Sequence, residues 1–290
     1  MSDASPAKRE PDWSDLAVRF GVATIMGAVA LAAMLAGGWA FRLMVILICA
    51  TVIWETARML SHGPAVRPLR LPPSRRAAKP AHTWAPVVIA ASSAAALLAA
   101  FLLPPGFALP FVFAPGLIGV RIMRHNRTLL MTFCVAILLA GWGLAEIRIR
   151  YGFEWALWMA VTVIVTDVFG YFAGRQFGGP KFWPRVSPKK TWSGTIAGWI
   201  AAAIVGAIWW IWFGASSQII GISVGISMAS QLGDIAESAM KRKMGVKDSS
   251  SLLPGHGGVF DRFDGMLGGA LLLLVVEAIV GFPPVPAAIQ

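Results

Sequence analysis

Cysteine and charge are both scarce in this chain of 290 residues. Its two cysteines, Cys49 and Cys134, lie inside apolar stretches, where a thiol usually behaves as a small hydrophobic side chain. There is no CxxC pair and no cluster of cysteine with histidine, so the sequence indicates neither a zinc site nor a disulfide framework. Charged residues make up only 13% of the chain, about half of their usual share in soluble proteins. This composition excludes an ordinary soluble domain.

Apolar residues are abundant instead, at 57% of the chain, and they are grouped in long runs. A helix needs about 20 mostly apolar residues to cross roughly 30 Å of bilayer hydrocarbon. Nine apolar windows can be drawn, at residues 17–38, 40–60, 84–103, 107–122, 128–146, 154–173, 194–214, 216–233 and 264–283. The sequence therefore predicts an all-α, polytopic membrane protein with about nine transmembrane helices. The fourth and eighth windows are short, and Pro110 and Pro115 interrupt the fourth, so whether these two cross fully stays open.

The basic residues indicate an orientation. If the N-terminus is cytoplasmic and all nine windows cross, every lysine and arginine except Arg42, Arg148 and Arg150 lies on the cytoplasmic side. Cytoplasmic loops of membrane proteins carry such an excess of positive charge. We therefore predict a multi-pass membrane protein with a cytoplasmic N-terminus and a C-terminus on the far side.

The net charge of +11 does not require nucleic acid as a partner. The positive residues are scattered between the apolar windows, where anionic lipid headgroups attract them. No signature of a nucleic-acid-binding module is present. The expected partner is therefore the lipid bilayer and not nucleic acid.

Three regions follow from these patterns. Residues 1–16 are expected to form a cytoplasmic tail. Residues 17–160 are expected to form membrane helices, with a basic, proline-rich loop at 61–83. Residues 161–290 carry the polar motifs, so we expect them to form the catalytic membrane region.

The last polar stretch of the chain combines carboxylates with cations near the ends of spans. Asp234, Ser238 and Lys241 are spaced to share one face of a helix. Asp261 and Asp264, three positions apart, also share a face. Carboxylates that face each other from two helices suit Mg²⁺, which usually binds one or two carboxylates together with water and substrate phosphates. We predict that the three aspartates bind this ion.

Basic residues and glycines surround these carboxylates. The cations that could hold phosphate groups here are Lys241, Arg242, Lys247 and Arg262. Glycines in the turn at 255–258 let backbone amides approach an anion closely. Within this turn, His256 either donates to a phosphate or only shapes the loop. A simpler interpretation of the acidic residues is that they neutralise nearby lysines and arginines at the membrane surface.

A second motif, Ser187–Thr191, reads Ser-Pro-Lys-Lys-Thr and comes just before an apolar window. Hydroxyls, ammonium groups and a helix N-terminus together suit a triphosphate. Lys189 and Lys190 could otherwise only anchor the chain at the membrane surface. Asp167 lies near the end of another span, where an ionisable residue is a functional candidate, and it could also pair with Arg175.

These motifs together resemble the signature of the phosphatidate cytidylyltransferase (CDP-diacylglycerol synthase) family. The matching run starts at Ser238, continues through Lys247-Asp248 and ends in Leu253-Pro-Gly-His-Gly-Gly-Val-Phe-Asp-Arg-Phe-Asp264. Upstream, Ser-Gln-Leu-Gly-Asp234 and the Ser187–Thr191 motif resemble further motifs of that family, in the expected order. The resemblance is specific over about residues 165–268.

The resemblance implies a helical membrane enzyme, a homodimer, that makes CDP-diacylglycerol from CTP and phosphatidic acid at the cytoplasmic face. It implies a magnesium centre on Asp234 and Asp261, with Asp264 close by, and assistance by potassium. The residues expected to be catalytic are Asp234, Asp261, Asp264 and Lys241. The residues expected to bind CTP and its phosphates are Ser187, Lys189, Lys190, Thr191, Arg242, Lys247, Asp248, His256 and Arg262.

The chain also departs from the family pattern, and other functions stay open. It has Ser193 where Glu is frequent, Ser249–Ser251 where small residues of another pattern occur, and Gly265 where Ser is common. The alternatives are a CTP-using lipid kinase, a cytidylyltransferase for another lipid phosphate, and a non-catalytic homologue. An ion or solute transporter would spread polar residues through several spans, whereas here they gather in two clusters predicted to be cytoplasmic.

Overall fold

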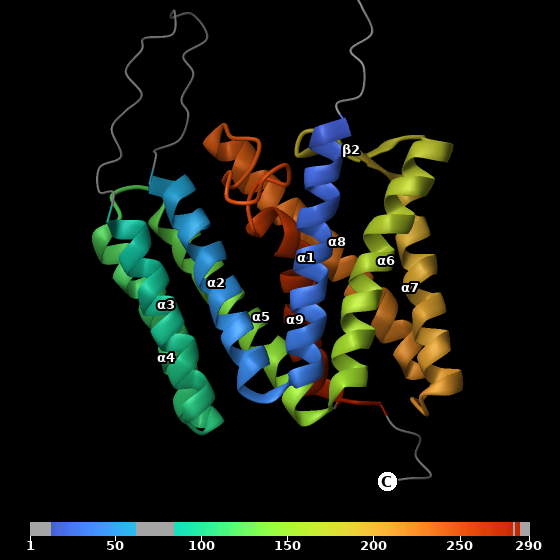
Figure 1. The fold of residues 1–290 in the computed structure, drawn as a ribbon, viewed down its shortest axis with the longest axis horizontal. Helices are drawn as coiled ribbons and strands as arrows, with labels where there is room; N and C mark the ends of the chain where they lie inside the picture. The colour runs from blue at the N-terminus through green and yellow to red at the C-terminus, as the bar shows by residue number, and fades with distance from the viewer. Residues whose placement is uncertain (1–12, 62–83, 281, 285–290) are drawn as a thin grey trace, which may run out of the picture.

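The computed structural model describes residues 13–61, 84–280 and 282–284. In these residues the chain forms nine helices and one β-hairpin (Figure 1). The helices are α1 (Trp13–Ala36), α2 (Gly38–Ser61), α3 (Ala85–Leu102), α4 (Pro105–Ile122), α5 (Arg127–Arg150), α6 (Phe153–Phe177), α7 (Trp192–Trp212), α8 (Gln218–Met244) and α9 (Phe260–Val280). Strands β1 (Lys181–Trp183) and β2 (Ser187–Thr191) lie between α6 and α7.

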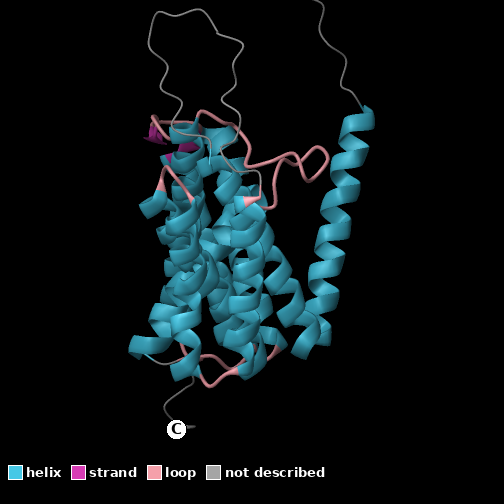
Figure 2. Cartoon of the chain, turned by 90° about the vertical axis from the view of Figure 1, so that its left-hand side faces the viewer, coloured by secondary structure: helices cyan, strands magenta, loops and turns pink. Residues whose placement is uncertain are grey.

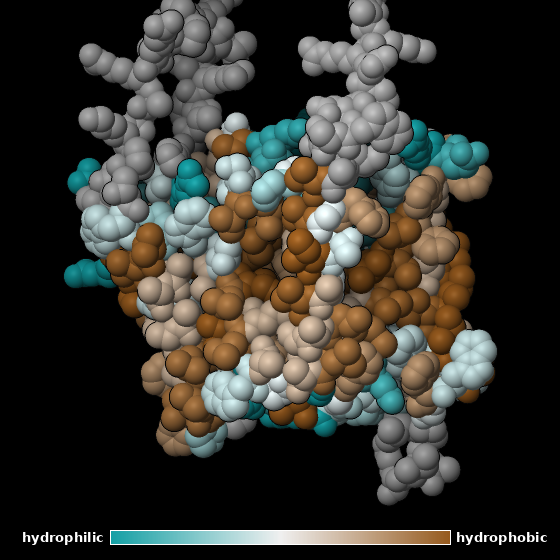
Figure 3. Space-filling model, in the orientation of Figure 1, coloured by the Kyte–Doolittle hydropathy of each residue, from teal (hydrophilic) through white to brown (hydrophobic). Residues whose placement is uncertain are grey.

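Each apolar window of the sequence coincides with one of these helices. Within the described ranges, six helices are long and apolar enough to cross a membrane, namely α2, α3, α5, α6, α7 and α8. A belt of apolar side chains covers the middle of the face shown in Figure 3, with hydrophilic residues above and below it. The prediction of a mostly helical, multi-pass membrane protein is confirmed.

The boundaries of several elements differ from the prediction. The first helix begins at Trp13, four residues before the apolar window predicted at 17–38, and most of the predicted tail at 1–16 lies outside the described residues. Helix α8 continues to Met244, well beyond the apolar window that ends at 233. The window ends early because polar residues lower the local hydropathy there, although the helix itself goes on. The proline-rich loop at 61–83 lies almost entirely outside the described residues. The apolar part of α4 is short, at Pro110–Ile122, and two prolines lie within that helix.

The helices form two groups. Helices α2 to α5 pack against one another, and α6, α7 and α8 form a second group. Helix α9 joins them, because it packs against α8 on one side and α5 on the other. Among the described residues, helix α1 contacts mainly α2 and α6, and it stands at the edge of the bundle (Figure 2).

One end of the bundle carries the irregular structure. The β1–β2 hairpin, antiparallel with Lys181 opposite Thr191, lies at this end with the segment 245–259 that joins α8 to α9 (Figure 1). The hairpin is a departure from the predicted all-α fold. Thr191 caps α7 by accepting a hydrogen bond from the Gly194 amide at 3.3 Å. Helix α8 ends at Gly245, whose φ of 71° is a left-handed conformation that glycine adopts without strain.

Candidate active site

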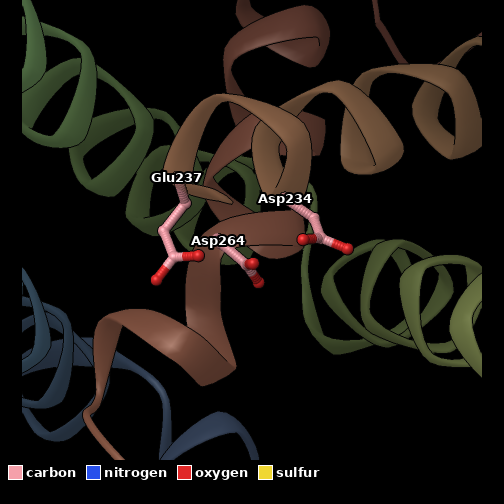
Figure 4. Close-up of side chains that lie close together, drawn as sticks. All are labelled: Asp234, Glu237 and Asp264. Atoms are coloured by element: carbon pink, nitrogen blue, oxygen red, sulfur yellow. The ribbon is translucent and has the colours of Figure 1, made fainter. Parts of the chain in front are cut away.

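Three carboxylates meet at the same end of the bundle. Asp234 and Glu237 come from α8, and Asp264 comes from α9 (Figure 4). One oxygen of each carboxylate lies within 4.8 Å of the others. The spacing of three residues puts Asp234 and Glu237 on one side of α8, and the packing of α9 against that side brings Asp264 to them. Three negative groups this close need compensation by positive charge.

Hydrogen bonds hold Asp234 and Asp264, and Asp234 also makes an ion pair. The Ser238 hydroxyl donates to Asp234 Oδ1 at 3.2 Å, and the Gly265 amide donates to Asp264 Oδ1 at 2.7 Å. Lys190 Nζ, from β2, makes an ion pair with Asp234 Oδ2. The hairpin is thereby tied to α8, and the second sequence motif meets the first.

Glycines allow α8 and α9 to approach closely at this cluster. A Cβ atom on Gly233 would lie 2.3 Å from the Asp264 carbonyl oxygen, and a Cβ on Gly268 would lie 2.3 Å from the Ala229 carbonyl oxygen. Real Cβ atoms do not come this near to backbone oxygens. The distance between Asp234 and Asp264 therefore depends on the absence of side chains at both glycines.

Gly268→Ala is expected to lower the midpoint of thermal unfolding in detergent. The added methyl group forces α8 and α9 apart, and over-packing of this kind costs about 1–3 kcal/mol. Gly221→Ala is the matched control in α8, because nothing lies within 4 Å of its added Cβ, and it should keep or raise the midpoint. Equal midpoints for the two variants would contradict the close approach of the helices.

Lys241 and Asp261 form a second cluster next to the first. Lys241 Nζ lies 2.5 Å from Glu237 Oε2 and 2.6 Å from Asp261 Oδ1. The other oxygen of Asp261 accepts hydrogen bonds from the Gly258 amide at 2.7 Å and from both the amide and the hydroxyl of Ser249 at 2.9 Å. Asp261 thus joins α8, α9 and the connecting segment.

The environment of Asp261 keeps it ionised. Asp261 lies on the first turn of α9, ahead of the apolar part of that helix. Burial would raise the pKa of its carboxyl group, but contacts with Glu237, Lys241 and the amides of Gly258 and Ser249 lower the pKa to about 2. Every oxygen of Asp261 is therefore charged and already engaged by the chain.

A cavity of about 330 Å³ opens beside Asp234, one of the three carboxylates. Helices α6, α7 and α8 and strand β2 contribute its walls. The lining residues are Thr166, Asp167, Gly170, Tyr171, Gly174, Arg175, Lys189, Lys190, Thr191, Gly194, Thr195, Gln231 and Asp234. Asp234 and Lys190 belong both to the cavity wall and to the contacts of the carboxylate cluster. The cavity combines cations, hydroxyls and the N-terminus of α7, which suits a phosphorylated ligand.

The structure does not bring all the predicted site residues to this cavity. Among the described residues, Lys247, Asp248 and His256 are absent from its lining. Asp248 lines a separate hollow of about 270 Å³ formed with the end of α2. The His256 carbonyl accepts hydrogen bonds from Arg262 Nε at 3.2 Å and Nη2 at 2.9 Å, so Arg262 holds the glycine turn.

Two further predicted residues lie apart from the cavity lining. Arg242 is exposed, and its guanidinium donates to the Val246 carbonyl at 3.4 Å. Ser187 begins β2 at the far end of the motif from Thr191. Their binding roles, and those of Lys247, Asp248, His256 and Arg262, stay predictions.

Sequence reasoning missed Glu237, which completes the cluster. It lies three residues after Asp234 and four before Lys241, a helical spacing that pointed to it. Gln231, three residues before Asp234, lies in the cavity wall, although the sequence assigned it no role. Both residues stand in the polar stretch that contains Asp234, but the sequence alone did not show which of its side chains face the site.

The donor set fits a divalent cation. Glu237 is buried, with no solvent access, and its carboxyl group contacts Lys241 and Asp261. Carboxylate oxygens of Asp234, Glu237 and Asp264 that lie within 4.8 Å of one another repel when charged, and a cation between them would offset that repulsion. Oxygen ligands from carboxylates are the kind that Mg²⁺ binds.

Comparison with known proteins identifies a family model and several relatives that this chain matches. A model described as the cytidylyltransferase family matches residues 17–280. A protein of Brucella suis named phosphatidate cytidylyltransferase is 47% identical over 142 residues, which are 48% of this chain and 52% of that protein.

Relatives from other bacteria carry the same name. The one from Staphylococcus saprophyticus is 38% identical over 160 residues, 52% of this chain and 61% of that protein. The one from Bacillus subtilis is 38% identical over 125 residues, 41% of this chain and 45% of that protein. The chain thus spans about half the length of the curated relatives that it matches.

Proposed function

The chain belongs to the cytidylyltransferase family, and we propose that it transfers the cytidylyl group of CTP to phosphatidate, giving CDP-diacylglycerol and pyrophosphate in phospholipid biosynthesis. The relatives named phosphatidate cytidylyltransferase support this choice of substrates. The observation that carries the proposal is the meeting of Asp234 with Glu237 and Asp264, next to a cavity whose wall holds Asp234 and its ion-pair partner Lys190.

The proposed reaction is a displacement at the α-phosphorus of CTP. A phosphate oxygen of phosphatidate forms the new P–O bond, and the bond to the β-phosphate oxygen breaks, releasing pyrophosphate. The attacking phosphate is already anionic at neutral pH, so no strong general base is needed. The difficulty is to bring two anions together and to stabilise charge on the leaving group, which fixed cations and dipoles accomplish.

Residues of the hairpin and of α7 are the proposed phosphate ligands. Lys189 and Lys190 supply ammonium groups to the cavity, and Thr191 brings the N-terminus of α7 to its wall. Backbone amides at a helix N-terminus attract phosphate. These groups would bind the triphosphate and orient its α-phosphorus toward the lipid phosphate.

Asp234, Glu237 and Asp264 are the proposed magnesium ligands. Magnesium would neutralise charge on the phosphates and polarise them when it is bound. The sequence also predicts Asp261 as a ligand, but its oxygens are engaged by Lys241, Ser249 and Gly258, which favours an anchoring role. Assistance by potassium stays a prediction.

An assay with purified protein tests the function. Radiolabelled CTP should yield a labelled lipid only when phosphatidate and Mg²⁺ are both present. Labelled lipid formed with another lipid phosphate in place of phosphatidate would support the alternative cytidylyltransferase, and transfer of the γ-phosphate would support the lipid kinase. Absence of any CTP-dependent product would overturn the proposal.

We further propose that the site faces the cytoplasm from the inner membrane of a bacterium. The distribution of lysine and arginine supports this orientation, and the start of α1 and the end of α9 lie at opposite ends of the bundle (Figure 1). Topology reporters fused at residue 75 and after residue 290 should therefore report opposite sides. The homodimer stays a prediction.

A further inference from the structure

Glu55 is a buried carboxylate within the apolar helix α2, and its side chain has no solvent access. It reaches the segment that joins α8 to α9. Glu55 Oε1 accepts a hydrogen bond from the Ser250 hydroxyl at 2.5 Å and Oε2 accepts one from the Ser249 hydroxyl at 3.0 Å. The amides of Val259 and Phe260 also donate to it, at 2.9 and 2.7 Å. Four donors about 200 residues away in sequence thus converge on one side chain.

We propose that Glu55 is a positioning residue, which holds the segment 245–259 and the first turn of α9 in the arrangement that the site requires. It acts through Asp261 and Asp264 and not on the substrate. The part of the proposal that concerns catalysis rests on the proposed function, whereas the anchoring of the segment does not.

Glu55 serves as the N-terminal cap of α9 from another helix. The amide of Phe260, the first residue of α9, and that of Val259 before it have no partner within the helix. A carboxylate at a helix N-terminus satisfies such amides and interacts favourably with the helix dipole. The direction in which α9 starts, and hence the place of Asp264 one turn later, is set by α2.

A chain of contacts connects Glu55 to the carboxylate cluster. The Ser249 hydroxyl lies 3.0 Å from Glu55 and 2.9 Å from Asp261 Oδ2, so one hydroxyl bridges two carboxylates. Asp261 contacts Lys241, which contacts Glu237. A hydroxyl has only one proton, so the Ser249 hydroxyl donates to one carboxylate at a time and the two share it.

Gly258 shows how tightly this anchor is packed. A Cβ atom there would lie 1.9 Å from Ser249 Oγ and 2.6 Å from Glu55 Oε1. The glycine therefore leaves room for the carboxylate and the hydroxyl to meet.

Hydrogen exchange of the purified protein tests the anchor independently of activity. In Glu55→Gln, one carboxylate oxygen becomes an amide nitrogen, which cannot accept a hydrogen bond. Amides of residues 249–260 should exchange about tenfold faster or more, which is the scale of losing a hydrogen bond to a charged group. Amides of the hairpin, residues 181–191, should exchange as in the wild type. Turnover at saturating CTP should fall by about tenfold or more.

Thr56→Val is the matched control. Thr56 is the next residue of α2, it is equally buried, and its hydroxyl donates only to the Val52 carbonyl of its own helix at 2.8 Å. This variant should leave both the exchange of residues 249–260 and the turnover within about twofold of the wild type. If it disturbed them as Glu55→Gln does, α2 would act through its general stability, and the proposal would be wrong.

Ser249→Ala keeps the proposal testable if Glu55→Gln fails to fold. It removes only the bridging hydroxyl, and it should raise exchange in residues 249–260 in the same pattern. Wild-type exchange in either variant would overturn the anchor. If Glu55→Gln loosened the segment while the wild type made no CDP-diacylglycerol, the anchor would stand and the proposed function would fail.

Discussion

Asp264→Asn is expected to reduce the rate of CDP-diacylglycerol formation by about a thousandfold while the protein stays folded. Asparagine keeps the size of the side chain, and its carbonyl oxygen can still accept the hydrogen bond from the Gly265 amide. The change removes one negative charge from a cluster whose oxygens lie within 4.8 Å of one another. Loss of about 4 kcal/mol of transition-state stabilisation through a weakened cation site corresponds to this factor.

The stability of the same variant should move in the opposite direction. Without metal, Asp264 is repelled by Asp234 and Glu237, so removing its charge should leave the thermal midpoint unchanged or raise it. Glu277→Gln is the matched control, because Glu277 lies toward the other end of α9 and accepts from the Tyr151 hydroxyl at 2.7 Å. It should keep the wild-type rate. Asp264→Asn with more than about a tenth of that rate would exclude this carboxylate from the site.

Lys241→Met is expected to cost about 3–5 kcal/mol of stability and to abolish activity as a consequence. Lys241 is the cation between Glu237 and Asp261, and all three side chains are largely buried. Removing it leaves two carboxylates without compensation, which is the costly way to break a buried ion pair. Thermal unfolding in detergent and the yield of folded protein measure this loss.

Two further variants identify the cause. Lys243→Met removes an exposed lysine from the same turn of α8 and should change the midpoint little. Lys241→Met combined with Glu237→Gln should recover part of the lost stability, because one uncompensated charge is gone. If Lys241→Met instead kept its stability and raised the KM for CTP tenfold or more, Lys241 would bind phosphate, as the sequence motif first suggested.

The helical part of the fold could be predicted because the bilayer imposes it. Each helix in the described part of the chain was predicted from a run of apolar residues. In lipid, such a run forms a helix because its backbone groups must be hydrogen-bonded within the segment. The ends were less accurate wherever a helix leaves the hydrocarbon. Asp234 and Lys241 lower the local hydropathy of α8, but the helix continues because its backbone bonding does not depend on the solvent. The β1–β2 hairpin is too short to leave a periodic pattern.

The site could be predicted in its residue types but only partly in its contacts. Helical spacing correctly placed Asp234 and Lys241 together on α8, and Thr191 does cap the N-terminus of α7. Spacing along one helix says nothing about which partner a side chain meets on another. The sequence therefore predicted Asp261 beside Asp234 with Asp264 nearby, whereas Asp264 lies with Asp234 and Asp261 contacts Lys241.

Glu55 shows the limit of such reasoning most clearly. A single carboxylate in an apolar helix is a signal that could have been noticed, because an ionisable residue within a span is costly without a partner. Its partners, however, are two hydroxyls and two backbone amides near residues 249–260. No local pattern connects segments so far apart, and only the packing of α2 against α9 and the end of α8 does so.

The hairpin lies at one end of the bundle (Figure 1), and there Lys190 meets Asp234 at the wall of the cavity. A phospholipid carries its headgroup at one membrane surface, and moving that charge through hydrocarbon is costly. Under the proposed function, Lys190 and Asp234 would therefore receive their lipid substrate from a single leaflet, and the activated lipid would return to that same leaflet.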